Sequence, residues 1–256
     1  MKRSRIPPLV LAATLVFLYL PLLAMAVHSF NASRFGGEWT GFTLKWYERL
    51  AQERVLLRSL STSLIVASVA TLVAAVFGTL SALALHRYRG RVQGAHLTLL
   101  TLPLVVPDVL MGLSLMVFFV ATSTQLGVGT IVVAHVTFCI SFVAMVVLAR
   151  LQDFDFSVIE AARDLGATAT QATAHVMLPL LAPGIVAGAL LSFTLSIDDF
   201  VITFFVAGPG STTLPIYIFS SLKHGSPPVI QALSVVMLAA TAVVAWLVLR
   251  LARRST

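Results

Sequence analysis

Six apolar runs, each long enough to cross a lipid bilayer, limit the possible folds of this chain more than any other feature. A spanning helix needs about 20 mostly apolar residues. The runs cover residues 7–29, 59–85, 97–120, 128–149, 179–206 and 231–250. We therefore predict an all-α, multi-pass membrane protein with six transmembrane helices, forming a single transmembrane domain over residues 1–256.

The composition supports a membrane location and weakens the usual interpretation of a basic chain. Hydrophobic residues make up 58% of the sequence and charged residues 11%, whereas soluble domains carry about 25% charged residues. The formal net charge of +7 would suggest nucleic acid in a soluble protein. Here it is better explained by basic cytoplasmic loops, so we expect no nucleic-acid partner.

The distribution of basic residues predicts the orientation. Six spans place both ends on one side, and that side carries eleven of the 17 Lys and Arg residues. We expect both termini and the loop 150–178 to be cytoplasmic and the stretch 30–58 to be external, with an amphipathic helix from Thr43 along the outer surface. Ala24-Met25-Ala26 resembles a signal-peptide cleavage site, but the apolar run before it is longer than a signal core. We expect it to be retained as a span.

Prolines and glycines modify two of the predicted spans. Pro103 and Pro107 should kink the third span, and Pro179 and Pro183 should kink the fifth near its start. The glycine pair Gly184 and Gly188 would let another helix approach the fifth span closely.

The cytoplasmic loop 150–178 contains a predicted short helix from Val158 to Leu165. Ser157 and Glu160 fit a capping box, with Ser157 at the N-cap, and Gly166 fits a left-handed helix end. Such a helix is too short to be stable alone in water, and it would present an apolar stripe. Something else must therefore cover the stripe: the bilayer, the ends of the spans or a partner.

The spacing in this loop resembles the EAA loop of ABC-importer permeases. Seven positions fit the pattern E-A-A-x3-G-x9-I-x-L-P, namely Glu160, Ala161, Ala162, Gly166, Val176, Leu178 and Pro179, with Val176 in place of Ile. The resemblance implies a type I ABC importer permease fold and a coupling helix that docks on a separate ATPase subunit. The chain has three lysines and no P-loop. We therefore predict no enzyme activity and no cofactor here, with ATP and Mg on the partner ATPase.

Three carboxylates, Asp108, Asp198 and Asp199, fall inside predicted spans, where no Lys or Arg can pair with them. An acid at a helix centre costs about 2.5–3.5 kcal/mol on insertion scales and marks a functional site by default. This acidic lining favours a cationic substrate. Three structural alternatives remain: Asp108 could bond backbone freed by Pro107, Ser196 could pack helices, and Trp46 could anchor at the interface.

Several segments extend the resemblance over nearly the whole chain, to the second permease subunit of spermidine/putrescine transporters. They are Ser29-Phe30-Asn31, Lys45-Trp46-Tyr47, Pro107-Asp108, the segment 134–139, the segment 192–199 and Leu214-Pro215. The resemblance implies that Trp46, Asp108, Ser196, Asp198 and Asp199 take part in polyamine passage. It leaves open the choice between putrescine and spermidine, and which of Asp198 and Asp199 faces the pathway.

The resulting hypothesis is a permease subunit of a polyamine ABC importer in the bacterial cytoplasmic (inner) membrane. The resemblance implies a second permease subunit, two ATPase subunits and an external polyamine-binding protein as partners. The alternatives are an ABC importer for another, cationic solute and a proton-coupled secondary transporter, because membrane carboxylates also relay protons. An intramembrane enzyme lacks a nucleophile–base pair. Six scattered histidines and the single Cys139 predict no metal site and no disulfide.

Overall fold

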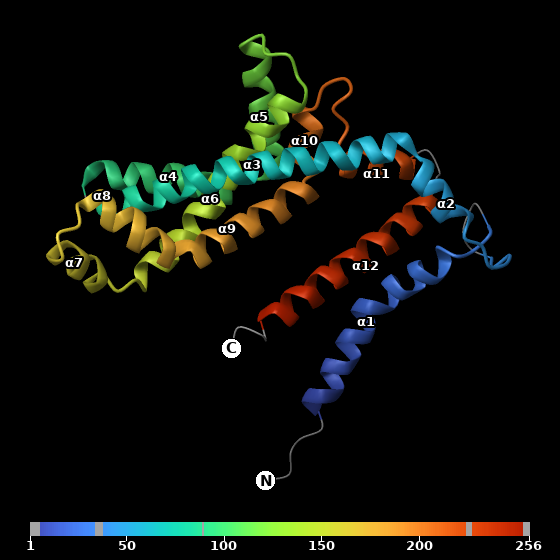
Figure 1. The fold of residues 1–256 in the computed structure, drawn as a ribbon. Coiled ribbons are helices and arrows are strands. Elements are labelled where there is room, and N and C mark those ends of the chain that lie inside the picture. Colours follow the sequence, from blue (N-terminus) through green and yellow to red (C-terminus); the bar gives the residue numbers. More distant parts are fainter. Residues whose placement is uncertain (1–5, 34–37, 89, 224–226, 253–256) are drawn as a thin grey trace. The chain divides into compact units, whose positions relative to one another are not determined.

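The structure, a computed structural model, describes residues 6–33, 38–88, 90–223 and 227–252. The described chain is helical (Figure 1), apart from loops and an isolated β-bridge between Asn31 and Phe42. The helices are α1 (Ile6–His28), α2 (Lys45–Gln52), α3 (Arg54–Arg87), α4 (Arg91–Val105), α5 (Asp108–Ala121), α6 (Val128–Gln152), α7 (Ser157–Asp164), α8 (Ala169–Ala172), the π-helical turn η1 (Thr173–Met177), α9 (Leu178–Asp198), α10 (Val201–Val206), α11 (Leu214–Lys223) and α12 (Pro227–Ala252).

Four helical segments of the described chain are long and apolar enough to cross a membrane. They are Val10–His28, Arg54–Arg87, Val128–Gln152 and Ala169–Asp198. A fifth crossing exists if Val92–Val105 and Asp108–Ala121 count as one span, and Pro228–Val243 is a shorter apolar helix. The all-helical class is confirmed, whereas six spans with both termini inside stay a prediction.

The third predicted span, 97–120, differs from the kinked single helix that the sequence suggests. Its two halves, α4 and α5, are bent by 110° at Val106 and Pro107. Pro107 lacks an N–H and disfavours helical geometry in the residue before it. Val106 accordingly adopts an extended conformation, with φ −69° and ψ 130°. Pro103, by contrast, is accommodated inside α4.

The fifth predicted span, 179–206, also differs from expectation at both ends. Its helix begins earlier, because α8, η1 and α9 form one apolar segment from Ala169. It ends at Asp198, where Asp199 takes an extended conformation with ψ 121°, and the chain resumes as the short helix α10. The predicted span is therefore a broken helix.

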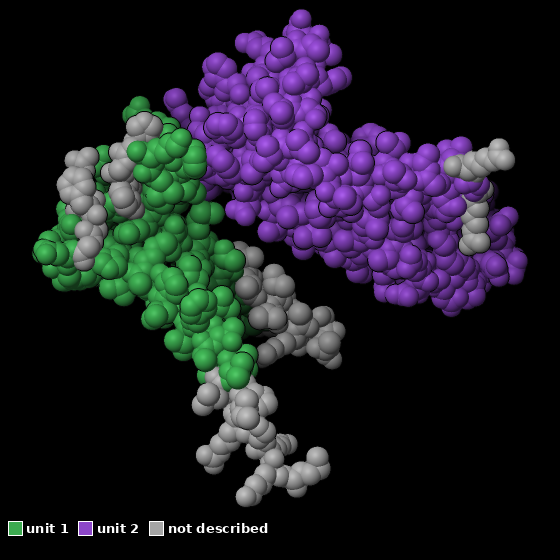
Figure 2. All heavy atoms as spheres, turned by 180° about the vertical axis from the view of Figure 1, so that it is seen from behind, with its two compact units in different colours: residues 1–57, 217–256 green, residues 58–216 purple. Residues whose placement is uncertain are grey.

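The chain divides into two compact units, residues 1–57 with 217–256 and residues 58–216 (Figure 2). In the second unit, α9, α4 and α10 all pack on α6, and α10 also packs on α5. A Cβ at Gly188 would lie 3.2 Å from Val143 Cα, so this glycine lets α9 approach α6. The predicted close approach at the glycine pair is thus confirmed.

In the first unit, α2 and α1 both pack on α12. Asn31 organises the segment before α2, because its amide donates to the Glu38 carbonyl at 2.8 Å and its Oδ1 accepts from the Thr40 N–H at 3.0 Å. Trp46 Nε1 donates to the Asn31 carbonyl at 2.8 Å. The amphipathic helix expected from Thr43 is present as α2.

Candidate translocation site and coupling segment

The two helix breaks line one cavity of about 410 Å³ within the second unit. Its lining comprises Pro103, Leu104, Val106, Asp108, Phe138, Phe142, Thr194, Leu195, Asp198, Asp199, Phe200, Val201 and Ile202. Irregular backbone at membrane depth is tolerated where it is buried in protein or lines a cavity, and broken helices commonly form transporter sites. This cavity is the candidate translocation site.

The three predicted carboxylates all line this cavity, but their environments differ. Asp108 and Asp198 are exposed, and no hydrogen bond or ion pair reaches either carboxylate within the described residues. The Asp199 side chain is only 9% exposed. Its carboxylate accepts hydrogen bonds from the Thr203 N–H at 2.8 Å and the Thr203 hydroxyl at 2.7 Å. The Asp199 carboxylate is thus hydrogen-bonded to the start of α10, whereas the Asp198 carboxylate has no such bond within the described residues.

A histidine that the sequence analysis did not assign to the site lies behind Asp199. His135 of α6 is 1% exposed, and its Nδ1 lies 2.7 Å from Ser196 Oγ. Its Nε2 lies 2.9 Å from Thr203 Oγ1 and 3.3 Å from Asp199 Oδ2. His135 and Thr203 are the polar residues that sequence reasoning missed, although a histidine in an apolar span is itself a signal.

Two of the predicted pathway residues do not line the cavity. Ser196 is buried, and its hydroxyl faces His135. Trp46 belongs to the first unit, where its side chain is 6% exposed and Lys45 Nζ lies 4.5 Å from the ring centroid. The structure therefore brings together Asp108, Asp198 and Asp199, with Ser196 in contact through His135.

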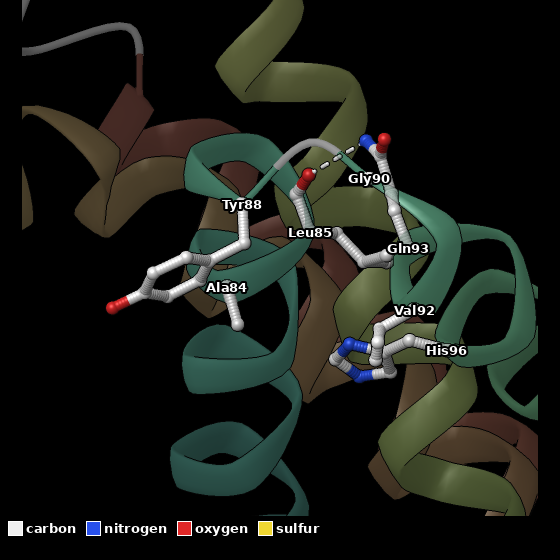
Figure 3. A pocket seen from close by; sticks show the side chains of 7 residues that line it. All are labelled: Ala84, Leu85, Tyr88, Gly90, Val92, Gln93 and His96. Atoms are coloured by element: carbon white, nitrogen blue, oxygen red, sulfur yellow. Dashed lines mark hydrogen bonds between the residues drawn. The ribbon is translucent and has the colours of Figure 1, made fainter.

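A second cavity, of about 430 Å³, lies at the turn between α3 and α4 (Figure 3). Gln93 spans this turn by donating from Nε2 to the Leu85 carbonyl at 3.0 Å, while the rings of Tyr88 and His96 lie along the wall. Among the described residues, no carboxylate lines this cavity. It therefore lacks the chemistry that marks the first one.

The expected short helix of the loop 150–178 is present as α7, but the capping box is wrong. Ser157 is already helical, its side chain makes no cap hydrogen bond, and Asp155 Oδ1 instead accepts from the Ser157 N–H at 3.0 Å. Hydrogen bonds from Ser157 lower the pKa of the Asp155 carboxyl. The helix therefore starts one residue earlier than predicted. The left-handed Gly166 is confirmed, with φ +92°.

The EAA segment presents a polar and apolar surface around α7. Glu160, Ala161 and Gly166 are exposed, and Leu165 is 90% exposed. An open cavity of about 550 Å³ adjoins this helix and is lined by Glu160, Arg163, Asp164, Gly166, Ala167 and Thr168. Leu178 and Pro179 begin α9 directly after the π-helical turn η1, so the proline, which lacks an N–H, follows the wider turn of the same helical segment. An eight-residue helix with no buried side chain and an exposed apolar residue is typical of a segment that contacts another protein or the membrane.

Broken apolar helices around an acid-lined cavity, together with an exposed short helix between two long ones, define a membrane transport permease. Residues 74–256 match the family described as binding-protein-dependent transport system inner membrane component. The chain belongs to this family of non-catalytic membrane subunits.

Two relatives from Escherichia coli (strain K12) match most of the chain. The putrescine transport system permease protein PotI is 42% identical over 239 residues, which cover 90% of this chain and 85% of that one. The spermidine/putrescine transport system permease protein PotC is 41% identical over 228 residues, covering 89% and 86%.

A solved structure shares the fold at low identity. It is a bacterial ABC transporter involved in the import of the acidic polysaccharide alginate, with a TM-score of 0.76, 14% identity and 98% coverage of both chains. The type I ABC importer permease fold is thereby confirmed. Since an acidic polysaccharide crosses that transporter, the fold itself does not select the cargo.

Proposed function

We propose that this chain is a permease subunit of an ATP-driven importer for polyamines, with putrescine and spermidine as the candidate substrates. The observation that carries the proposal is the acid-lined cavity between two helix breaks. The names of the two E. coli relatives support the same class of substrate.

The chemistry of the cavity suits an alkyl diammonium. Asp108 and Asp198 offer carboxylates without a protein partner in the described chain, and no Lys or Arg is among the residues that line the cavity. Phe138 and Phe142 contribute aromatic faces, which attract a cation by about 0.5–2 kcal/mol depending on desolvation. The apolar remainder of the wall suits the methylene chain between two ammonium groups.

The working unit in this proposal contains a second permease subunit, two ATPase subunits that bind ATP and Mg, and an external polyamine-binding protein. It lies in the bacterial inner membrane with six spans and both termini in the cytoplasm. The exposed α7 docks on an ATPase subunit. Closure of the ATPase pair moves α7, and the adjoining η1 and α9 carry that motion toward the break at Asp199.

Uptake of labelled putrescine and spermidine by import-deficient cells that express the whole transporter tests this proposal. We expect saturable uptake, lowered roughly ten-fold or more by Asp108→Asn or Asp198→Asn, because hydrogen bonds to charged groups contribute about 1.5–3 kcal/mol. Asp199→Asn should also lower uptake while the complex still assembles. Glu38→Gln, an exposed acid outside the cavity, is the matched control and should leave uptake unchanged.

Two other functions predict different results. An ABC importer for another cationic solute would hydrolyse ATP with its binding protein but accumulate neither polyamine. A proton-coupled transporter would keep working after ATP depletion and stop when an uncoupler collapses the proton gradient. Full activity of both Asp108→Asn and Asp198→Asn would refute a cation pathway through this cavity.

A further inference from the structure

His135 joins both sides of the break between α9 and α10. Ser196 lies near the end of α9, Thr203 lies in α10, and Asp199 lies between the two helices. All three side chains contact the one imidazole ring, at 2.7, 2.9 and 3.3 Å. The ring itself is buried in the packed core of the second unit, where Phe138 lies 5.3 Å away between ring centroids.

A count of hydrogen atoms assigns the direction of the contacts around Thr203. The single hydroxyl hydrogen of Thr203 goes to Asp199 Oδ2, its shortest contact at 2.7 Å. His135 Nε2 must then carry a hydrogen, which it donates to Thr203 Oγ1 with Asp199 Oδ2 close by. Nδ1 faces the Ser196 hydroxyl, which can donate to this nitrogen or accept from it. The ring thus links Thr203 through Nε2 to Ser196 through Nδ1.

The network determines which carboxylate can meet a cation. Asp199 accepts from Thr203 and also from the Ile202 N–H at 3.3 Å, so its oxygens are directed at α10. Asp198, one position earlier, ends α9 with an exposed side chain. Asp199 has left the helix, with ψ 121°, and its carboxylate is bonded to Thr203 of α10, beside His135.

We propose that His135 is a positioning residue for cargo passage. It holds Ser196 and Thr203 across the helix break and keeps the Asp199 carboxylate on α10, so that the ammonium groups of the cargo meet Asp108 and Asp198. This inference rests on the proposed function for its substrate. Ser196 then acts through His135 and does not touch the cargo.

The test is a mutant cycle in the assembled transporter, with uptake expressed per complex in the membrane. His135→Leu removes both polar edges of the ring and should lower the maximal uptake rate roughly five-fold or more, because buried partners lose their hydrogen bonds. His135→Gln keeps a donor toward Thr203 and should restore most of the rate. Thr137→Val is the matched control, since Thr137 is exposed on the same helix and its hydroxyl bonds, within the described residues, to the Val133 carbonyl alone.

The Ser196→Ala variant separates positioning from direct contact. If Ser196 acts through His135, the double variant His135→Leu/Ser196→Ala should transport as fast as His135→Leu alone. The proposal would be overturned if the double variant lost uptake by the product of the two single losses. It would also be overturned if His135→Gln did not restore the uptake rate. A wild-type complex that hydrolyses ATP but imports neither polyamine would refute the proposed cargo instead. In that case the unfolding midpoints of the same variants test the network itself. Midpoint losses that add up for His135→Leu and Ser196→Ala would show that the two side chains do not interact.

Discussion

At the residue scale, two adjacent acids have opposite environments. Asp198 is exposed at the cavity, whereas the Asp199 side chain is 9% exposed and bonded to Thr203. The sequence predicts only that the two side chains diverge. The difference between them arises because α10 needs an acceptor for its first N–H groups, and Asp199 supplies it.

This difference can be measured by thiol labelling. The chain's single cysteine, Cys139, is fully buried and gives little background. A small cationic thiol reagent should label Asp198→Cys faster than Asp199→Cys. Equal rates at the two positions would contradict the assignment of Asp198 to the cavity surface.

The cap of α7 gives a second prediction at this scale. Asp155→Ala should loosen the start of α7 and lower uptake several-fold with the amount of complex unchanged, whereas Asp155→Asn should be tolerated because Asn is also a good cap. ATP hydrolysis and uptake measured together in the two variants check this. If Asp155→Ala couples as well as wild type, the cap has no role.

The pH dependence of this cap follows from the lowered pKa of Asp155. A carboxyl whose pKa is lower when folded stabilises the fold above its ordinary pKa, and loses that effect as pH falls through the lowered value. Between pH 6 and 8 the carboxylate is fully ionised. The ratio of Asp155→Ala to wild-type uptake should therefore stay constant across that interval.

The acids of the site could be predicted from the sequence, but the network behind them could not. A carboxylate in an apolar run is conspicuous because of its insertion cost. His135 contacts Ser196 and Thr203 across 61 and 68 positions of sequence. Such pairings follow from how α6, α9 and α10 pack, which residue spacing along one helix does not reveal.

At the element scale, the two helix breaks differ in how far the sequence predicts them. Pro107 marks the first, although its 110° bend exceeds a simple proline kink. The second has no proline, and in the sequence it is marked by the adjacent acids Asp198 and Asp199, which do not by themselves predict a helix end. The Asp199 carboxylate accepts hydrogen bonds from the first N–H groups of α10. These bonds stabilise a new helix at this point relative to a continued α9.

The packing of α9 on α6 gives a prediction for a single glycine. Gly188→Val should separate the two helices and lower the unfolding midpoint of the complex, with an overpacking cost of about 1–3 kcal/mol. The control is Gly129→Ala in α6, where a Cβ would meet nothing within 4 Å. Thermal unfolding in detergent compares the two. A Gly188→Val complex as stable as wild type would mean that α9 does not approach α6 so closely.

At the scale of the whole molecule, the fold class and the coupling loop follow from patterns that repeat along the chain. Apolar runs predict helices, and seven positions at fixed spacing predict the EAA segment. The number of crossings is harder to derive, because α4 and α5 pass the length test only as a bent pair. Hydropathy measures apolar content and is insensitive to a break in direction.

The predicted orientation sets which end of the cavity can open to the binding protein, so it is the last prediction to test. Glu48 in α2 and Thr170 in α8 are both exposed, and the distribution of Lys and Arg places them on opposite sides of the membrane. In intact spheroplasts, a membrane-impermeant maleimide should label Glu48→Cys, and should reach Thr170→Cys only after permeabilisation. The reverse pattern would put α7 outside the cell, beyond the reach of a cytoplasmic ATPase. Coupling through the EAA segment would then be impossible, whatever the cavity binds.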